Sequence, residues 1–306
     1  MAVPRGKMSS EGPTFSRLAQ GFGSAAGWGK DADGVHDHIR ACLDMGITTM
    51  DTAAAYGGGR SEELIGAVLA KAPGLREQIE LVTKCAIGSY GTSLYHYNTE
   101  KDSIVSELER SLRRMSTDHV DVLLLHRPDP LMDADEVAEA FVQLRESGKV
   151  LHFGVSNFTP PQFELLSSRL GFPLITNEIE FSVLHLDPCR DGTLDMCQRL
   201  RISPMFWGPL GGGRLFQAVP GYHPSEDTKR VFRVRGTLQE VGEELGGAST
   251  DQVAITWLLK HPANGVVLLG SGALEEISSV VRACELDLSR EQWFRVWVAS
   301  TGSKLP

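Results

Sequence analysis

Short apolar runs alternate with longer amphipathic segments along the whole chain. The runs have the length of β-strands, and the segments between them repeat apolar residues every three or four positions, as helices do. Strands that alternate with helices form right-handed βαβ units and a parallel sheet. Eight such units close into a (β/α)8 barrel, the TIM barrel. The eight runs are Ser16–Gly21, Ile47–Asp51, Ile79–Lys84, Val120–His126, Leu151–Ser156, Leu174–Glu178, Ile202–Trp207 and Gly265–Leu269.

Capping residues mark where several helical segments begin and end. In Ser103–Met115 the apolar residues fall on one face of a helix. Ala134–Ser147 ends at Gly148, which suits a helix C-cap, and Pro160 stands in the first turn of the next helix. A last helix, Ser289–Ser300, follows the eighth unit, and we expect it to pack outside or beneath the barrel.

No break in composition and no Gly/Ser-rich linker divides the 306 residues. We therefore predict a single domain over residues 1–306, in which residues 1–14 form a flexible or hairpin N-terminus. Two connections are unusually long, namely Cys85–Thr99 and Gly208–Thr228. Loops of this length often serve as lids or binding loops, and the aromatic residues in both suggest a partly apolar substrate.

Composition and charge exclude several classes of function. The net charge is −9, and no block of Lys or Arg is long enough to follow a nucleic-acid backbone. The five cysteines form no CxxC pair, which argues against a zinc site or a disulfide framework and favours a reducing cytosol. No signal peptide is expected, and no stretch approaches the roughly 18 apolar residues that span a membrane. We expect a cytoplasmic monomer or weak oligomer.

Four polar residues follow apolar runs in the first half of the chain. Asp51 ends the second run, Tyr56 lies a few residues further on, Lys84 ends the third run and His126 ends the fourth. If the runs are parallel barrel strands, all four side chains gather at the carboxyl-terminal rim, where such barrels hold their active sites. An acid, a phenol, an amine and an imidazole at one rim predict a site that donates a proton.

Reduction of a carbonyl is one reaction that needs such a proton donor, at the oxygen, while a cofactor delivers a hydride. A free tyrosine has a pKa of about 10, and a nearby ammonium lowers that pKa. Asp51 would keep Lys84 charged, Tyr56 would act as the general acid, and His126 would orient the carbonyl oxygen. Each residue alone also has a plain structural explanation, such as a helix cap, a rim lysine or loop packing. The four together favour catalysis.

The chain resembles the aldo-keto reductase family over roughly residues 15–295. That family carries an Asp-Tyr-Lys-His tetrad in this order, which the resemblance places at Asp51, Tyr56, Lys84 and His126. The resemblance implies an NAD(P)H-dependent oxidoreductase that reduces an aldehyde or ketone to an alcohol. The strings that carry it are Asp51-Thr52-Ala53, Val82-Thr83-Lys84, Leu124-Leu125-His126 and Gly154-Val155-Ser156-Asn157-Phe158.

The resemblance also implies the residues that would hold the nicotinamide cofactor. Ser156 and Asn157 would bind the carboxamide, to which Asn offers both a donor and an acceptor. Glu178 stands where the family usually has Gln, and an ionised carboxylate accepts but cannot donate. Trp207 replaces the usual stacking Tyr, and the glycines after it let backbone amides approach the pyrophosphate. The other expected cofactor contacts are Gly23, Ser24, Gly208, Leu210, Gly211, Gly212, Arg214, Gly270, Ser271, Gly272 and Glu276.

The adenosine end of the expected cofactor site departs from the family pattern. Where related sequences carry Lys or Arg for the 2′-phosphate of NADPH, this chain has Ala273 and Glu276. A carboxylate repels a phosphate but can accept from a free ribose hydroxyl. The resemblance implies NADPH, and these two residues predict weaker discrimination against NADH. Arg214 or Arg282 could supply the missing cation.

The segment Gly21–Ala26 also matches the G-x-G-x-x-A fingerprint of a dinucleotide-binding βαβ unit. A true fingerprint runs directly into a helix, but here Gly27–Asp31 intervenes, so a helix can hardly begin before about Ala32. In the barrel interpretation this segment is the first loop at the rim, with Trp28 near the substrate mouth. Tyr97, in the first long loop, is a second candidate substrate contact, although surface decoration is the simpler alternative.

Two other classes of function are open on sequence grounds. A nicotinamide-binding subunit could report redox state to a partner with little turnover, as channel-associated members of the family do. A barrel enzyme of unrelated chemistry, such as an isomerase, would need no nicotinamide. The intact tetrad favours the reductase, acting on a small carbonyl compound without a metal.

Overall fold

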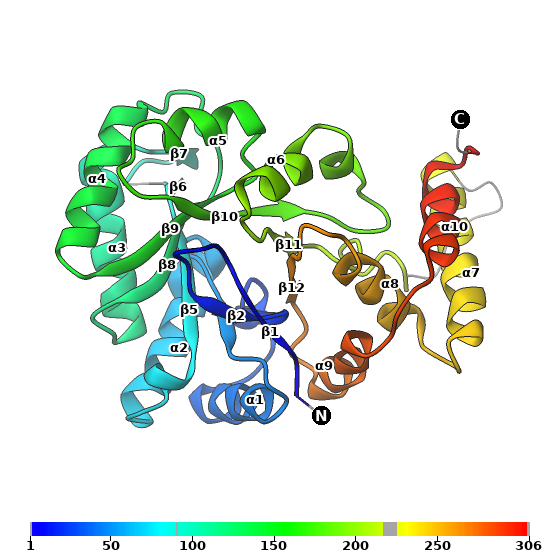
Figure 1. Ribbon diagram of the computed structural model, residues 1–306. Helices are drawn as coiled ribbons and strands as arrows, with labels where there is room; N and C mark the ends of the chain where they lie inside the picture. Colours follow the sequence, from blue (N-terminus) through cyan, green and yellow to red (C-terminus); the bar gives the residue numbers. More distant parts are fainter. Residues whose placement is uncertain (1, 90, 217–224, 305–306) are drawn as a thin grey trace.

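The apolar runs assemble into one closed barrel of eight strands (Figure 1). A computed structural model describes residues 2–89, 91–216 and 225–304. The barrel strands are β3 (Leu18–Gly21), β4 (Thr49–Asp51), β5 (Glu80–Cys85), β8 (Val120–Leu125), β9 (Val150–Ser156), β10 (Leu174–Glu180), β11 (Met205–Trp207) and β12 (Val266–Leu269). All neighbours pair in parallel, in the order β10-β11-β12-β3-β4-β5-β8-β9. The predicted (β/α)8 barrel is confirmed.

Three strands begin at least two residues later than the apolar runs predict: β3, β11, and β4, which starts at Thr49 instead of Ile47. The first run starts at Ser16, which instead ends β2 (Thr14–Ser16); this strand pairs antiparallel with β1 (Arg5–Lys7). The seventh run starts at Ile202, but β11 begins at Met205, directly after Pro204. Proline has no N–H to donate to a neighbouring strand, so it suits the position just before a strand.

The amphipathic segments form helices around the barrel. The helices are α1 (Ala32–Asp44), α2 (Arg60–Lys71), α3 (Lys101–Met115), α4 (Ala134–Glu146), α5 (Pro160–Ser167), α6 (Thr193–Leu200), α7 (Glu226–Glu244), α8 (Thr250–Leu259), α9 (Leu274–Val281) and α10 (Arg290–Thr301). Short 3-10 turns include η1 (Ala25–Gly27) and η2 (Tyr56–Gly59). None of the described helices is long and apolar enough to cross a membrane.

Helix starts follow the capping residues of the sequence. Thr159 and Gln162 form a capping box ahead of α5, with Pro160 in the first turn. Helix α1 begins at Ala32, where the Asp31 side chain accepts from the Gly34 amide. The glycine-rich segment before it forms η1 and a loop, so it does not run into a helix. This start excludes the dinucleotide-binding βαβ fingerprint.

Apolar side chains fill the barrel interior and the layer between strands and helices. The interior cluster joins the N-terminal hairpin to the strands, because Met8 and Phe15 pack there beside Val82, Leu124 and Met205. All five side chains are fully buried. The hairpin therefore packs against the interior from the amino-terminal side, which leaves the carboxyl-terminal rim for polar groups.

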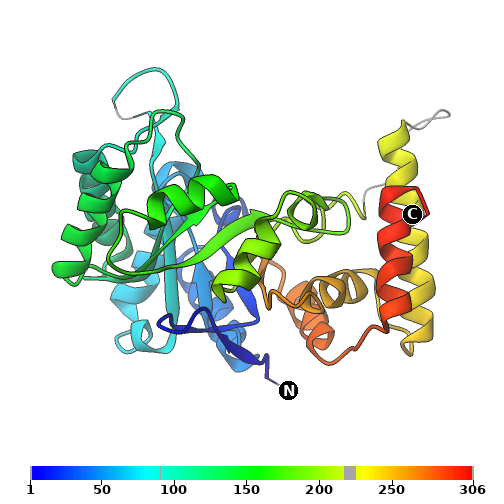
Figure 2. The same ribbon diagram turned by 45° about the horizontal axis from the view of Figure 1, so that its top comes forward.

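The two long connections differ in form. The first carries a small antiparallel pair, β6 (Ile87–Gly88) and β7 (His96–Tyr97). Residues 217–224 of the second lie outside the described residues, and α7 begins beyond them with Ser225 as its N-cap. Helices α7 and α10 lie side by side on one outer side of the molecule (Figures 1 and 2). The expectation that the last helix packs outside the barrel is confirmed.

Candidate active site

Neighbouring strands bring the four predicted polar residues to one rim of the barrel. Asp51 ends β4, Lys84 lies near the end of β5, His126 directly follows β8, and Tyr56 opens η2. The three strands pair in this order, so residues distant in sequence become neighbours. Lys84 is fully buried, and Asp51 and His126 are 2% and 8% exposed. A buried cluster of ionisable groups is the usual setting for perturbed pKa values.

Lys84 is the centre of this cluster. Its ammonium donates to Asp51 Oδ1 at 2.5 Å, to the Thr52 carbonyl at 3.1 Å and to the Tyr56 hydroxyl oxygen at 3.3 Å. Burial alone would lower the pKa of Lys84, but the nearby carboxylates of Asp51 and Glu178 outweigh burial and raise it. The lysine therefore stays charged at neutral pH. Nothing in the sequence pattern indicated the carbonyl of Thr52 as a partner.

Glu178 brings a second carboxylate to the same ammonium. Its Oε2 atom lies 3.2 Å from Lys84 Nζ, and the side chain is 2% exposed. Burial, followed by repulsion from Asp51, raises the pKa of Glu178 to about 8. The carboxyl is then mostly protonated at neutral pH and can donate as well as accept. The sequence predicted Glu178 as a cofactor contact; its contact with Lys84 appears only when β10 and β5 close the barrel.

Burial raises the pKa of Tyr56 to about 12. The Lys84 ammonium acts in the opposite direction, whereas Asp51 and Glu178 raise the pKa further. Lys84 thus lowers the pKa as expected, but burial and the two carboxylates outweigh its effect. Tyr56 consequently holds its proton throughout the neutral range.

The ring of His126 meets Tyr56 edge-on, with 5.4 Å between ring centroids and an interplanar angle of 86°. Burial, together with the positive charges of Lys84 and Arg127, lowers the pKa of His126 to about 3. The imidazole is therefore neutral and offers one donor and one acceptor. Its Nδ1 is buried and has no hydrogen-bond partner among the described residues.

At the end of β9, Ser156 and Asn157 adopt a geometry that only the structure reveals. Asn157 has a positive φ of 60°, which Asn tolerates better than most residues. Its amide nitrogen donates to Ser156 Oγ at 2.7 Å, and its oxygen accepts from the Trp207 indole at 3.0 Å. One N–H and one lone pair of the amide remain for a ligand. These two residues and Trp207 are thus brought together as the sequence predicted.

Arg127 lies over the outer part of this site and was not among the predicted residues. Its guanidinium carbon is 5.5 Å from the centroid of the Trp207 ring. Among the described residues it forms no ion pair, although it is partly buried. The position directly after His126 on the rim is the signal that could have identified it.

The loop after β11 is a run of tight turns. Gly211 has a φ of 62°, and a Cβ there would lie 2.8 Å from a Leu184 methyl. Gly212 has a φ of 65°, and a Cβ on it would meet no atom within 4 Å. The loop closes on itself through the Gly211 amide, which donates to the Gly208 carbonyl at 2.8 Å. Leu210 packs partly on the core. Such backbone suits close approach by a phosphate.

Arg214 at the end of this loop forms an ion pair with Asp227 of α7. Its carbonyl accepts from Arg235. The guanidinium therefore has a carboxylate partner, and a phosphate would have to compete for it. Among the described residues, Arg282 forms no ion pair.

The loop after β12 meets the first loop of the barrel. Ser24 donates to the Gly270 carbonyl at 3.0 Å, and the Trp28 indole donates to Ser24 at 3.1 Å. Gly272 lies directly under the Trp28 ring, since a Cβ there would approach the indole to 2.5 Å. Further along, Ser271 donates to the Glu276 carboxylate at 2.6 Å. This pair stands where the sequence predicted the 2′-hydroxyl or 2′-phosphate of the cofactor.

The two predicted substrate contacts, Trp28 and Tyr97, lie away from the tetrad in this structure. Gly23 lies against the Tyr56 ring, because a Cβ added to Gly23 would be 3.7 Å from ring atoms of Tyr56. Trp28 instead packs on Gly272, and its ring centroid is 4.9 Å from that of His38. Trp28 is thus tied to the loop after β12. Tyr97 is 41% exposed on β7, and no ring contact or hydrogen bond among the described residues joins it to the tetrad.

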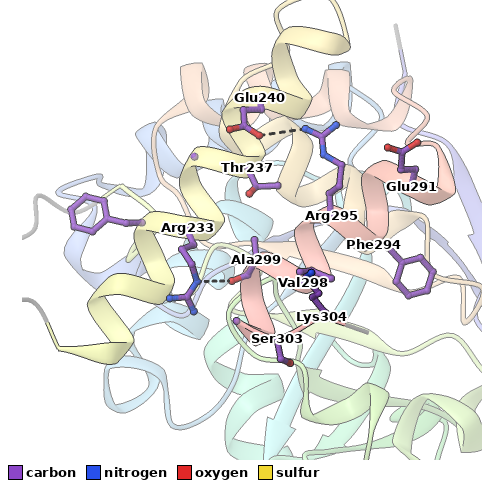
Figure 3. A pocket seen from close by; sticks show the side chains of 13 residues that line it. Arg233, Thr237, Glu240, Glu291, Phe294, Arg295, Val298, Ala299, Ser303 and Lys304 are labelled. Atoms are coloured by element: carbon purple, nitrogen blue, oxygen red, sulfur yellow. Dashed lines mark hydrogen bonds and ion pairs between the residues drawn. The ribbon is translucent and has the colours of Figure 1, made fainter. Parts of the chain in front are cut away.

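A groove of about 760 Å³ lies between α7 and α10, well outside the barrel (Figure 3). Arg295 crosses it to Glu240, and Arg233 reaches the Ala299 carbonyl. Its lining shares no residue with the tetrad or the loops after β11 and β12. The groove therefore plays no part in the candidate active site.

The residues at the rim fit a nicotinamide cofactor. The Asn157 amide keeps a donor and an acceptor for the carboxamide, Trp207 offers a flat face, and Gly212 leaves its backbone open to a phosphate. The buried, unpartnered Nδ1 of His126 leaves hydrogen-bonding capacity next to Tyr56. The groups that suit this cofactor thus lie along one part of the rim, from β9 through β11 to β12.

Comparison with known proteins identifies the family of the chain. The model of the aldo/keto reductase family matches residues 18–297. Oxidoreductase YdhF of Escherichia coli is 45% identical over 99% of this chain and 100% of its own length. A 6-dehydroglucose reductase of Agrobacterium fabrum is 44% identical over 90% of this chain and 92% of its length.

A solved structure agrees in fold over nearly the whole chain. The thermostable aldo-keto reductase Tm1743, in complex with the inhibitor epalrestat, superimposes with a TM-score of 0.79. It is 26% identical, and the match covers 97% of this chain and 99% of that one. Its agreement extends the match from sequence to the barrel that carries the tetrad. The chain therefore belongs to the aldo/keto reductase family of oxidoreductases.

Proposed function

We propose that this protein reduces an aldehyde or ketone to an alcohol with NAD(P)H. The contact that carries the proposal is the 3.3 Å hydrogen bond between Lys84 Nζ and the Tyr56 hydroxyl, held by the buried Asp51 carboxylate. The bound cofactor supplies the hydride, which no side chain can do. Tyr56 supplies the proton at the carbonyl oxygen, because it is protonated at neutral pH and has a cation beside it to stabilise the phenolate.

The other residues position this donor and the substrate. Asp51 fixes the Lys84 ammonium, and Lys84 orients the Tyr56 hydroxyl by a hydrogen bond. His126, as a neutral imidazole, donates a hydrogen bond to the carbonyl oxygen and polarises it. Ser156, Asn157 and Trp207 would hold the nicotinamide, through the free donor and acceptor of the Asn157 amide and the flat face of Trp207.

For the cofactor, we propose binding of both NADPH and NADH with little discrimination. Glu276 accepts from Ser271, and we assign its carboxylate to the 2′ position of the cofactor. It would accept from a ribose hydroxyl and repel a phosphate. The Arg214 guanidinium is already paired with Asp227, which reduces its value as a substitute cation.

For the substrate, we propose a small aldehyde that carries hydroxyl groups. Arg127 places donors next to His126 at the mouth of the site and has no carboxylate partner among the described residues. The relative from Agrobacterium fabrum is named for a dehydrosugar, which is such a compound. This proposal replaces the partly apolar substrate suggested by the aromatic loops, since Tyr95 and Tyr97 are 61% and 41% exposed.

The test is oxidation of NADPH, and separately of NADH, followed at 340 nm with polyhydroxylated, aliphatic and aromatic aldehydes. In Tyr56→Phe the turnover should fall by a factor of about 100 or more, since general acid catalysis contributes about 10² to 10⁴. Cofactor binding, measured by fluorescence, should be retained. The matched control is Tyr95→Phe, which removes the same hydroxyl from an exposed loop.

Undiminished turnover in Tyr56→Phe would contradict the proposal. Tight cofactor binding by the wild type without turnover of any aldehyde would instead favour the redox-reporting subunit. Failure to bind either nicotinamide would favour unrelated barrel chemistry.

A further inference from the structure

Two carboxylates share the ammonium of Lys84. Asp51 Oδ1 lies 2.5 Å and Glu178 Oε2 lies 3.2 Å from Nζ, and none of the three side chains is more than 3% exposed. Each of the two carboxyl groups also affects the pKa of the other, because they lie close together. Asp51 and Glu178 arrive on different strands, β4 and β10. The lysine therefore contacts two carboxyl groups that come from different strands.

Lys84, Asp51 and Glu178 form a trio whose net charge controls how readily the Tyr56 hydroxyl ionises. One ammonium beside one carboxylate is neutral overall, and the ammonium is the nearer of the two to the phenol oxygen. When Glu178 is also ionised, the trio carries one net negative charge. A negative charge close to a phenol in a buried site disfavours the phenolate.

Other charged groups around this site do not replace Glu178. His126 is neutral, and on β9 and β11 the neighbouring groups Ser156, Asn157 and Trp207 carry no charge. Arg127 lies beyond the Trp207 ring. Glu180, two residues further along β10, faces His185 at 3.8 Å instead of Lys84.

We propose that Glu178 is a positioning residue that offsets the charge of Lys84 and keeps Tyr56 protonated into the alkaline range. The proposal rests on the proposed function of Tyr56 as the proton donor. Because the pKa of Glu178 is raised to about 8 by burial, its negative charge develops above neutral pH, before Tyr56 would ionise. Glutamine at this position would leave the ammonium opposed by Asp51 alone.

The direct test is ionisation of Tyr56, read from tyrosinate absorbance at 295 nm. The difference between wild type and Tyr56→Phe isolates this residue, and the same difference in the Glu178→Gln background isolates it there. We expect the midpoint in Glu178→Gln to lie at least one pH unit below that of the wild type. At pH 10 this corresponds to about tenfold more phenolate, since one unit is a factor of ten.

The same shift should appear in the rate of carbonyl reduction. In Glu178→Gln the alkaline loss of kcat/KM should begin at least one pH unit earlier than in the wild type. The matched control is Glu180→Gln, which removes a carboxylate from the same strand and should leave both midpoints unchanged.

Superimposable tyrosinate titrations of wild type and Glu178→Gln would overturn the inference, even if the reductase activity itself is established. An equal shift in Glu180→Gln would also overturn it, because the effect would then be one of general charge. The titration requires no turnover, so it decides the inference even if Glu178→Gln is inactive.

Discussion

The Lys84 ammonium lies 2.5 Å from the Asp51 carboxylate, and both groups are buried at the carboxyl-terminal rim of the barrel. Breaking such a pair by removing one partner usually costs about 3 to 5 kcal/mol, because the other charge is left buried and unpaired. Here the carboxyl group of Glu178 also lies 3.2 Å from the ammonium. The two partners of this pair are therefore not equally replaceable.

Asp51→Asn should destabilise the protein less than Lys84→Met does. In Asp51→Asn the repulsion that helps to keep Glu178 protonated is lost, so Glu178 can ionise beside the ammonium, and we expect a loss of about 2 kcal/mol in the free energy of unfolding. Lys84→Met leaves two carboxyl groups without a cation, and we expect about 3 to 5 kcal/mol. Urea denaturation at pH 7 measures both. Equal losses in the two variants would show that Glu178 does not share the ammonium.

Stability should fall with rising pH because of Glu178. Burial raises its folded-state pKa from 4.5 to about 8, so the folded protein holds a proton that the unfolded chain releases. The resulting stabilisation is present below about pH 4.5 and is lost as pH rises to 8. Denaturation of wild type and Glu178→Gln at pH 5, 7 and 9 tests this. Relative to the wild type, the free energy of unfolding of the variant should increase from pH 5 to pH 9. A difference between the two proteins that stays constant with pH would contradict the prediction.

His126 should not titrate in the neutral range. Burial first, and then the charges of Lys84 and Arg127, lower its pKa to about 3. Nitrogen NMR of the imidazole should therefore show one neutral form from pH 5 to 8. A midpoint for His126 near 6.5 would show that the ring is solvated, and its proposed role as a neutral donor would fail.

Glu276→Arg should improve NADPH binding selectively. The change replaces a carboxylate beside Ser271 with a cation that can pair with a 2′-phosphate. We expect the Kd for NADPH to fall about tenfold, equivalent to about 1.4 kcal/mol, with the Kd for NADH changed by less than a factor of about three. Glu275→Arg adds the same charge one position earlier on α9 and serves as the control. In the wild type, a Kd for NADPH tenfold or more below that for NADH would contradict our assignment of Glu276.

The local pattern was sufficient to predict the barrel and the starts of those helices that carry clear caps. Alternating runs identified all eight strands, because buried parallel strands are short and apolar throughout. Caps such as Thr159 with Pro160 gave helix starts to within a residue. The apolar run did not reveal that β11 starts only after Pro204. Proline cannot donate a hydrogen bond to a neighbouring strand.

By itself, the sequence determined the architecture, the family and which four polar residues reach one rim. These follow from periodicity and strand ends, which are properties of neighbouring positions along the chain. Only the tertiary structure decided that Glu178 shares Lys84 with Asp51, that Trp28 packs on Gly272 and that the pKa of Tyr56 is raised. Those outcomes depend on distances between separate strands and on the exclusion of water. Burial and charge pairing arise only when the barrel closes.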